Sequence, residues 1–264
     1  MFKAGFTTVE PRLAHWDTCY VRDLFRRRDR LSERGGLKVA YYIDSVSFVT
    51  VLAGKKLPYH RENAEEILYV LQGRGRLNAG GSTRDVGPRD AVYLPPRTPY
   101  SVEPLVEGQH ILFAQYLVAS PLDAQRVMAT KAAEDEPVQA KALIRNWTDV
   151  ASSPGHEGTC LTYPVFSRDS MRFFLFATMM TVPGTLSYHR HNSESVYMVD
   201  SGSGVVKVAG EEQELRPLDA VYMPPEVAHG CRNALPDQPL NVFCVGVAVP
   251  HDAEVWTVDD LPEA

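Results

Sequence analysis

The chain has 264 residues, of which 44% are hydrophobic and 23% charged, and its formal net charge is -6. This composition is typical of a globular protein that can bury a core, and it excludes a disordered, collagen-like or uniformly basic nucleic-acid-binding chain. No apolar run approaches the roughly 18–20 residues of a membrane helix, and no secretory signal is visible, so we expect a cytoplasmic protein.

Short apolar, β-branched and aromatic runs separated by Gly, Pro and Asp predict a series of strands. An arginine-rich stretch, residues 22–34, precedes them, and its interspersed acids predict a solvated helix or turn face. The expected strands cover residues 45–51, 67–71, 91–94, 111–118, 172–182, 196–199, 220–223 and 240–249. Many short strands at regular spacing are typical of an antiparallel sandwich or barrel, so we expect an all-β fold.

An internal repeat divides the chain into two halves. The run Tyr59-His60-Arg61-Glu62-Asn63 recurs as Tyr188-His189-Arg190-His191-Asn192, 129 positions later. The same offset aligns further identical residues, among them Glu65 with Glu194, Gly73 with Gly202, Asp90 with Asp219, and Pro95-Pro96 with Pro224-Pro225. Chance does not align so many identities, and the two halves are therefore copies of one fold.

The segment between the copies has a different character. Residues 121–130 and 139–145 have helical composition, and Ser120 followed by Pro121 is typical of a helix start. We therefore expect an N-terminal domain over residues 1–120, a partly helical linker over 121–150, and a C-terminal domain over 151–264.

Three histidines of the second copy suggest a metal site. His189 and His191 are two positions apart, so on a strand both side chains point to one side, and His229 follows a Pro-rich turn that can bring it back beside them. Three neutral imidazoles with open positions hold a divalent transition metal and leave room for substrate or dioxygen. The histidines outside the repeated motif segments, for which we expect surface or structural roles, are His15, His110, His156 and His251.

Two motifs carry a family resemblance. Gly54-x5-His60-x-Glu62-x3-Glu66-x6-Gly73 and Gly184-x4-His189-x-His191-x3-Ser195-x6-Gly202 resemble the first cupin motif. Asp219-x4-Pro224-Pro225-x3-His229-x3-Asn233 and its copy Asp90-x4-Pro95-Pro96-x3-Tyr100 resemble the second. The chain is similar to the bicupins, which implies two jelly-roll β-barrels in tandem. In that superfamily the two histidines and the glutamate of the first motif and the histidine of the second are the metal ligands.

The second copy departs from the motif at one position. Ser195 stands where the motif has glutamate, which indicates a three-histidine site, and strand alternation aims the adjacent Glu194 to the opposite side. The His-Arg-His run, the missing glutamate and Gly202 resemble the gentisate and salicylate ring-cleaving dioxygenases, which are three-histidine iron bicupins. This resemblance implies a mononuclear iron(II) dioxygenase that acts on a small organic acid, with a hydroxylated aromatic acid as the leading substrate.

The first copy keeps His60 and Glu66, whereas Glu62 and Tyr100 replace the second and third histidines. Two interpretations are open. His60, Glu62, Glu66 and Tyr100 form a second, oxygen-rich metal site, since carboxylates and phenolates bind metals. In the alternative interpretation, which we favour, this barrel has lost its metal site and serves as a scaffold and dimer surface.

Three further side chains are candidates for catalysis. Arg172 could clamp a substrate carboxylate and is favoured over Arg190, which alternation turns away from its histidine neighbours. Tyr197 and Tyr222 are candidate proton donors or oxyanion partners. The four cysteines are widely spaced without a Cys-x-x-Cys pair, which favours free thiols.

Two alternatives to the dioxygenase stay open. One is a non-oxidative manganese-, nickel- or zinc-dependent hydrolase, lyase or isomerase, similar to the ureidoglycine aminohydrolases. The other is a non-catalytic cupin that binds a small ligand. In each case we expect a small-molecule partner, no nucleic acid and no membrane, and a homodimer by analogy with other bicupins.

Overall fold

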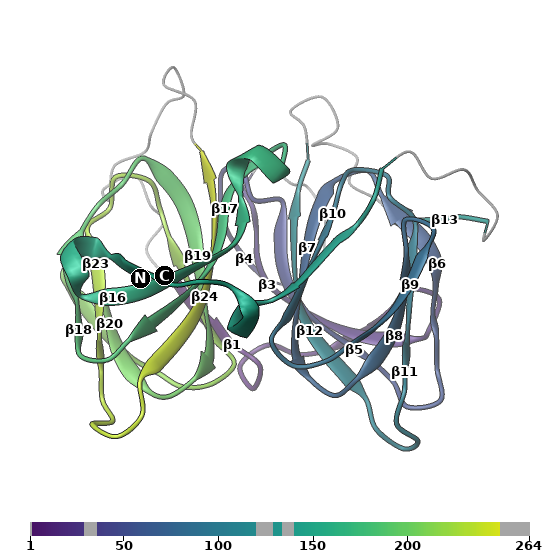
Figure 1. Cartoon of the computed structure of the whole chain (residues 1–264), viewed down its shortest axis with the longest axis horizontal. Coiled ribbons are helices and arrows are strands. Elements are labelled where there is room, and N and C mark those ends of the chain that lie inside the picture. The colour runs from purple at the N-terminus through teal and green to yellow at the C-terminus, as the bar shows by residue number, and fades with distance from the viewer. Residues whose placement is uncertain (1, 29–35, 120–128, 134–139, 249–264) are drawn as a thin grey trace.

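The computed structural model describes residues 2–28, 36–119, 129–133 and 140–248. Figure 1 shows two β-barrels side by side, one from each half of the sequence. The described residues contain strands β1 to β24 and only short 3-10 turns as helical structure, η2 (Trp147–Asp149), η3 (His156–Gly158) and η4 (Arg168–Ser170). The predicted all-β fold of tandem jelly rolls is confirmed.

The N-terminal barrel has an eight-stranded and a five-stranded sheet. The larger sheet has the order β14-β10-β7-β12-β5-β3-β2, with β4 beside β3. Its strands are β2 (Arg12–Ala14), β3 (Cys19–Arg27), β4 (Leu37–Ala40), β5 (Ser45–Val51), β7 (Glu65–Gln72), β10 (Asp90–Leu94), β12 (Ile111–Val118) and β14 (Leu143–Asn146). The smaller sheet, β13-β6-β11-β8-β9, consists of β6 (Leu57–Glu62), β8 (Gly75–Ala79), β9 (Ser82–Val86), β11 (Tyr100–Pro104) and β13 (Ala129–Lys131).

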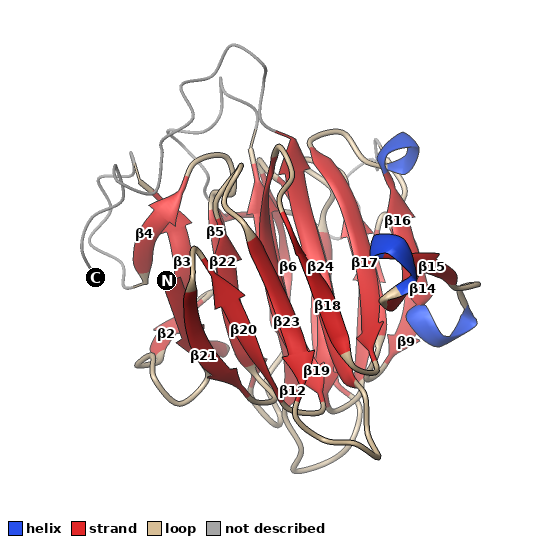
Figure 2. Ribbon diagram, turned by 90° about the vertical axis from the view of Figure 1, so that its left-hand side faces the viewer, coloured by secondary structure: helices blue, strands red, loops and turns tan. Residues whose placement is uncertain are grey.

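The C-terminal barrel has a seven-stranded and a four-stranded sheet. The larger sheet, β1-β22-β19-β24-β17-β16-β15, consists of β1 (Phe2–Gly5), β15 (Ser153–Gly155), β16 (Cys160–Ser167), β17 (Phe174–Val182), β19 (Ser193–Ser201), β22 (Asp219–Met223) and β24 (Leu240–Ala248). The smaller sheet consists of β18 (Thr185–His189), β20 (Gly204–Val208), β21 (Glu211–Leu215) and β23 (His229–Asn233). Figure 2 looks onto these four strands, which lie in the order β18-β23-β20-β21.

Two local predictions are wrong. The predicted helix over 139–145 is replaced, where the chain is described, by a loop and by β14, which pairs with β10. Residues 129–130 of the predicted helix over 121–130 lie in β13, which pairs with β6, and residues 121–128 lie outside the described residues. The strands β13 and β14 each gain backbone partners from one neighbouring strand at a sheet edge, and this nonlocal pairing overrides helical composition.

The arginine-rich stretch is also not a solvated helix or turn face where it is described. Residues 22–27 lie in β3, and Arg26 is only 6% exposed. Residues 29–34 of the stretch lie outside the described part of the chain. Leu24 and Phe25 are fully buried, so the strand is fixed by its apolar residues, and the interspersed acid Asp23 pairs with Arg12 at 2.7 Å.

Three hydrophobic clusters hold the molecule together. One fills each barrel, and the third lies between the barrels and contains residues of both halves. In this third cluster the rings of Tyr69 and Phe243 stack with centroids 4.2 Å apart, and Tyr69 Oη donates to Asp200 at 2.7 Å. The strand β1 adds to the interface because it pairs with β22 of the C-terminal barrel. The barrels are therefore packed as one unit.

A pair of buried glutamates joins the barrels reciprocally. Glu65 on β7 accepts hydrogen bonds from the backbone N–H groups of residues 172–174, at 2.6 and 2.9 Å for the last two. Glu194 on β19 accepts hydrogen bonds from the backbone N–H groups of residues 41–43, the shortest at 2.7 Å. Tyr93 Oη donates to Glu65 and Tyr222 Oη donates to Glu194. The repeat in the sequence is thus also a repeat of interface contacts.

The described residues contain no helix that is long and apolar enough to cross a membrane. All four cysteines are free and buried, as predicted. Burial raises the pKa of Cys231, the cysteine nearest in sequence to His229, to about 12, which favours the neutral thiol over a reactive thiolate.

Candidate metal centre

The structure brings His189, His191 and His229 together. His189 ends β18 and is the Cα partner of His229, the first residue of β23, while His191 lies in the loop just beyond β18. One ligand atom from each histidine lies within 4.8 Å of the others. The ring centroid of His229 is 4.6 Å from that of His189 and 4.9 Å from that of His191. Three imidazole nitrogens therefore surround a single point.

Hydrogen bonds at Nδ1 orient these rings. His189 Nδ1 lies 2.7 Å from the carbonyl oxygen of Ser187, and His229 Nδ1 lies 2.8 Å from that of Val227. A carbonyl only accepts, so Nδ1 carries the proton and Nε2 keeps its lone pair. The Nε2 atoms of both histidines are buried, and no partner for them is found among the described residues. Such orphaned, pre-oriented nitrogens fit a metal ion.

The electrostatics of the site favour the neutral forms of His191 and His229. Burial, with smaller contributions from the neighbouring histidines, lowers the pKa of His229 to about 3. Burial and His189 also lower the pKa of His191. Because a metal binds the neutral form of imidazole, these lowered pKa values leave His191 and His229 ready to bind a cation at neutral pH.

The position of the missing motif glutamate lies on the barrel side of β19. Ser195 is fully buried, and its Oγ has no hydrogen-bond partner in the described part of the chain. Glu194 points to the opposite side, where it binds the backbone of the N-terminal barrel, as strand alternation predicts. Carboxylate ligation by Glu194 is therefore not part of this centre.

The three predicted catalytic side chains lie in different places. The ring of Tyr197 is 5.9 Å from that of His229, so this tyrosine lies against the histidines. Tyr222 belongs to the cluster between the barrels, and its Oη donates to Glu194 at 3.3 Å. The Arg172 backbone binds Glu65, and its guanidinium lies 5.4 Å from the ring centroid of Phe173. The contacts of Tyr222 and Arg172 thus place them at the interface rather than beside the histidines.

The N-terminal barrel has a related but different cluster. His60 is fully buried, its Nδ1 lies 2.7 Å from the carbonyl oxygen of Pro58, and its Nε2 finds no partner among the residues described. Glu66, predicted as a possible ligand, accepts hydrogen bonds at Oε1 from Tyr100 Oη at 2.7 Å and from Gln115 Nε2 at 2.6 Å. The donor atoms that lie within 4.8 Å of one another belong to His60, Glu62 and His15. His15 joins the cluster in place of Glu66, while Tyr100 packs on His60 with ring centroids 4.5 Å apart and donates its hydroxyl to Glu66.

Two histidines outside the motifs thus lie at the two clusters, contrary to the expected surface or structural roles. The ring of His156 is 4.2 Å from that of His189, and the ring of His15 is 5.1 Å from that of His60. Of the other two histidines, His110 is exposed and accepts a hydrogen bond from the backbone N–H of Ala53, and His251 lies outside the described residues.

His15 and His156 each begin the same kind of hairpin loop. His15 begins the loop between β2 and β3, and His156 begins the loop between β15 and β16. Their φ angles are 48° and 47°, and each carbonyl accepts a hydrogen bond from a threonine hydroxyl three residues later, Thr18 at 2.8 Å and Thr159 at 2.7 Å. The left-handed backbone is costly for a histidine, and the threonine bond helps to hold it.

A second repeat in the sequence marks these hairpins. His15-Trp16-Asp17-Thr18-Cys19 recurs as His156-Glu157-Gly158-Thr159-Cys160, 141 positions later. This offset differs from 129 because Cys19 and His60 are 41 positions apart, whereas Cys160 and His189 are 29 positions apart. A comparison at the single offset of 129 therefore misses the His-x-x-Thr-Cys repeat.

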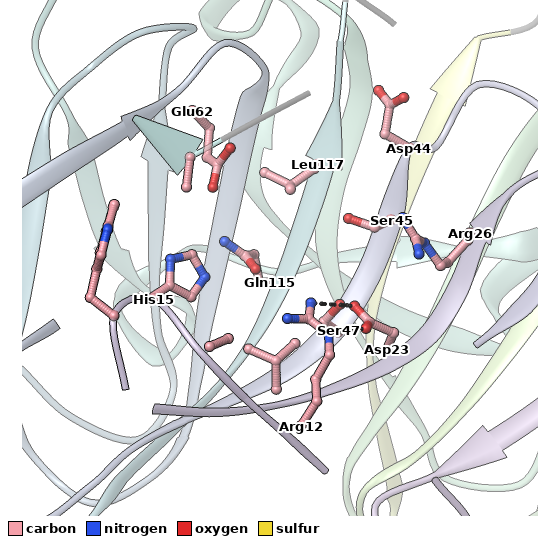
Figure 3. Close-up of a pocket in the computed structure, with 14 residues that line it drawn as sticks. Arg12, His15, Asp23, Arg26, Asp44, Ser45, Ser47, Glu62, Gln115 and Leu117 are labelled. Atoms are coloured by element: carbon pink, nitrogen blue, oxygen red, sulfur yellow. Dashed lines mark hydrogen bonds and ion pairs between the residues drawn. The ribbon is translucent and has the colours of Figure 1, made fainter. Parts of the chain in front are cut away.

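A polar cavity of about 340 Å³ opens beside the N-terminal cluster. Its lining includes His15 and Glu62 together with Arg12, Asp23, Arg26 and Gln115. Figure 3 shows His15, Glu62 and Gln115 around the same space, with the ion pair between Arg12 and Asp23 at its side. Small polar molecules can therefore reach the N-terminal cluster.

Comparisons with known proteins agree with this architecture. The cupin domain model matches residues 47–106 and 178–246, one segment in each barrel. A sequence relative is an uncharacterised protein of Methanocaldococcus jannaschii, 35% identical over 60 residues, which are 22% of this chain. The match spans 48% of that relative, about half of its length.

Solved structures share the fold at low sequence identity. A glyoxylate-induced protein of Pseudomonas aeruginosa superimposes with a TM-score of 0.68 and 19% identity, covering 94% of this chain and 86% of its own. A variant of the Bacillus subtilis oxalate decarboxylase superimposes with a TM-score of 0.67 and 16% identity, covering 96% of this chain and 78% of its own. Another structure of that decarboxylase, with a TM-score of 0.66 and 16% identity over 96% of this chain and 78% of its own, comes from a study of its Mn(II) centres.

Proposed function

Because the chain is a bicupin, with one cupin domain in each barrel, we propose that the C-terminal barrel is the centre of a metal-dependent enzyme that acts on a small organic acid. One observation carries the proposal: the donor atoms of His189, His191 and His229 converge within 4.8 Å. The buried Nε2 atoms of His189 and His229, which lack partners in the described structure, support it. Satisfied core histidines would not leave such atoms without partners.

The donor set favours an anionic substrate. A bound divalent metal would supply Lewis acidity and, as iron(II), reactivity toward dioxygen. Three neutral imidazoles leave both positive charges of such an ion uncompensated, so a carboxylate is attracted to it. His189 and His229 hold their rings through backbone carbonyls, and Tyr197 lies against His229, so these residues fix the geometry in which a substrate would be oriented.

The leading reaction is iron(II)-dependent cleavage of a hydroxylated aromatic acid by dioxygen. It is supported by the three-histidine set with Ser195 in place of the motif glutamate. A second candidate is a non-oxidative lyase, hydrolase or isomerase that uses manganese, nickel or zinc. The structural likeness to the Bacillus subtilis oxalate decarboxylase, studied for its Mn(II) centres, supports this candidate.

Oxygen consumption separates the two reactions. Chelator-stripped protein is loaded anaerobically with iron(II) or with manganese(II), and hydroxylated aromatic acids and oxalate are supplied in turn. We expect stoichiometric oxygen uptake with an aromatic acid and iron(II) only. Substrate loss with manganese(II) and no oxygen uptake would establish the second candidate, and substrate binding without turnover under either metal would overturn both.

Two variants assign the activity to the site. His229→Ala removes one of the three converging nitrogens, so we expect turnover and metal content to fall together. His110→Asn is the matched control, because His110 is an exposed histidine whose described hydrogen bond goes to the backbone of Ala53. Full activity in His229→Ala would contradict the assignment.

A further inference from the structure

We propose that the N-terminal barrel holds a second divalent-metal site formed by His15, His60 and Glu62, in which His15, a residue outside both cupin motifs, supplies a ligand. This site lies in a different barrel from the C-terminal centre and uses different ligands, so the two sites can be tested separately. Its ligand class is a divalent first-row transition metal.

The burial of His60 is the first observation. Its side chain is fully buried, and its ring is fixed through Nδ1 by the carbonyl oxygen of Pro58, 2.7 Å away. Its Nε2 is buried without a partner in the described structure. A buried polar atom without a partner is destabilising, and a metal bond would remove this cost. His189 in the other barrel shows the same arrangement, with Ser187 in the role of Pro58.

The donor set is the second observation. Nitrogens of His15 and His60 and a carboxylate oxygen of Glu62 lie within 4.8 Å of one another. Two histidines and one carboxylate are a common ligand set for zinc and for non-haem iron, and the set leaves coordination positions open. Glu62 is 5% exposed, and a buried carboxylate favours a nearby cation.

The hairpin that carries His15 is the third observation. The strands β2 and β3 pair Ala14 with Cys19, so the loop between them is short, and Thr18 Oγ1 holds the carbonyl of His15. Trp16 packs edge-on to His60 with ring centroids 6.0 Å apart. The hairpin therefore delivers His15 to His60 through a fixed backbone rather than a mobile tip. The matching hairpin of the other barrel delivers His156 to His189 in the same way.

The cavity is the fourth observation. His15 and Glu62 line the polar cavity of about 340 Å³ shown in Figure 3, together with the guanidinium groups of Arg12 and Arg26. A metal at the cluster would thus have its open positions facing a space that a small molecule can enter. A structural ion sealed in a core would have no such access.

Cobalt(II) titration of the metal-free full-length protein tests the proposal, with calorimetry for stoichiometry and visible absorption for ligand type. We expect two cobalt ions per chain in the wild type. In His15→Asn the new residue tolerates the left-handed backbone. We expect this variant to bind metal in the N-terminal barrel at least ~100-fold more weakly and therefore to bind one ion fewer. Glu62→Gln, which is isosteric, should do the same. His110→Asn should retain both ions.

The variant His229→Ala distinguishes this proposal from the proposed function. If the wild type binds one ion and His229→Ala abolishes it, the second site is overturned while the C-terminal centre stands. If His15→Asn or Glu62→Gln binds two ions with unchanged absorption, the ligand assignment is wrong. Loss of one ion in His15→Asn and of the other in His229→Ala supports both sites. Circular dichroism tests whether each variant is folded. If either His15→Asn or Glu62→Gln does not fold, the other of the two tests the N-terminal site.

Discussion

The two barrels share a scaffold and differ in the donor atoms that it presents. In each barrel the first motif histidine, His60 or His189, turns its Nδ1 to a backbone carbonyl two residues earlier. In each barrel its Cα partner on the neighbouring strand is the third ligand position, Tyr100 in one and His229 in the other. The scaffold thus sets equivalent positions, and the residues at those positions decide which donor atoms each barrel presents.

The difference between the donor sets is a difference in charge. The C-terminal set consists of three neutral imidazoles, whereas the N-terminal set includes the carboxylate of Glu62. With the same divalent ion, the net charge of the ion and its protein ligands would therefore be +2 in the C-terminal barrel and +1 in the N-terminal barrel. On the two proposed assignments, the C-terminal barrel would be the better site for an anionic substrate.

The largest effect should come from His229→Ala. We expect the C-terminal metal affinity to fall about 1000-fold or more, because one of three ligands is lost, while binding in the N-terminal barrel is unchanged. Metal analysis per chain after dialysis measures the loss. A His229→Ala protein that retains its full metal content would show that the C-terminal barrel does not bind metal in the way proposed.

The next effect concerns the two interface glutamates. Glu65→Ala and Glu194→Ala each leave three backbone N–H groups without their acceptor, so we expect each to lower the free energy of unfolding by about 3 kcal/mol. Urea denaturation measures both. The corresponding Gln variants, which keep one acceptor oxygen, should lose less, and a large loss in only one of the Ala variants would show that the interface is not symmetric.

Ser195→Glu should have a smaller effect. It places a carboxylate at the barrel side of β19, where Ser195 Oγ now lies buried without a partner in the described structure, and so adds a fourth ligand. We expect manganese(II) to gain about tenfold in affinity relative to the wild type, since carboxylate ligands suit manganese. Competition between manganese(II) and cobalt(II) reports the shift, and unchanged selectivity would argue against this orientation of position 195.

The smallest effect should come from His156→Asn, and it sharpens the comparison of the hairpins. His156 contacts His189 but is not part of the cluster of converging donor atoms, so we expect a loss of affinity of about tenfold at most, the lower end of the range for a residue that orients a ligand. His15→Asn should cost at least ~100-fold in its own barrel, because His15 is in the cluster. Equal losses for the two variants would mean that both hairpin histidines play the same role.

Much of this arrangement is predictable from the sequence, because it is local or repeated. The duplication follows from the alignment of Gly, Pro and Asp residues at one offset, and the convergence of three histidines follows from motif positions that recur on adjacent strands. The hairpin histidines escape that comparison, because the first copy is longer between Cys19 and His60 than the second copy is between the matching residues.

Other features depend on nonlocal packing. The strand β12 is buried at all eight positions and β19 at its first seven, because one face fills a barrel and the other packs between the barrels. Alternation of apolar and polar residues is then lost, so it cannot tell the two faces apart. The same is true of β22, whose last four residues are all buried. The sequence therefore predicts that Tyr222 is buried, but not that it lies at the interface between the barrels. The edge strands β13 and β14 are likewise fixed by their partners rather than by composition.

The reciprocal glutamates have a consequence for assembly. Two copies of one fold that exchange the same contact, Glu65 with one loop and Glu194 with its counterpart, are related as the subunits of an isologous dimer. In this chain the two-fold relation is internal, so the surface through which a single barrel would pair with its twin is already occupied. A homodimer of the whole chain must therefore use a different face, and its subunits would bring together four barrels rather than two.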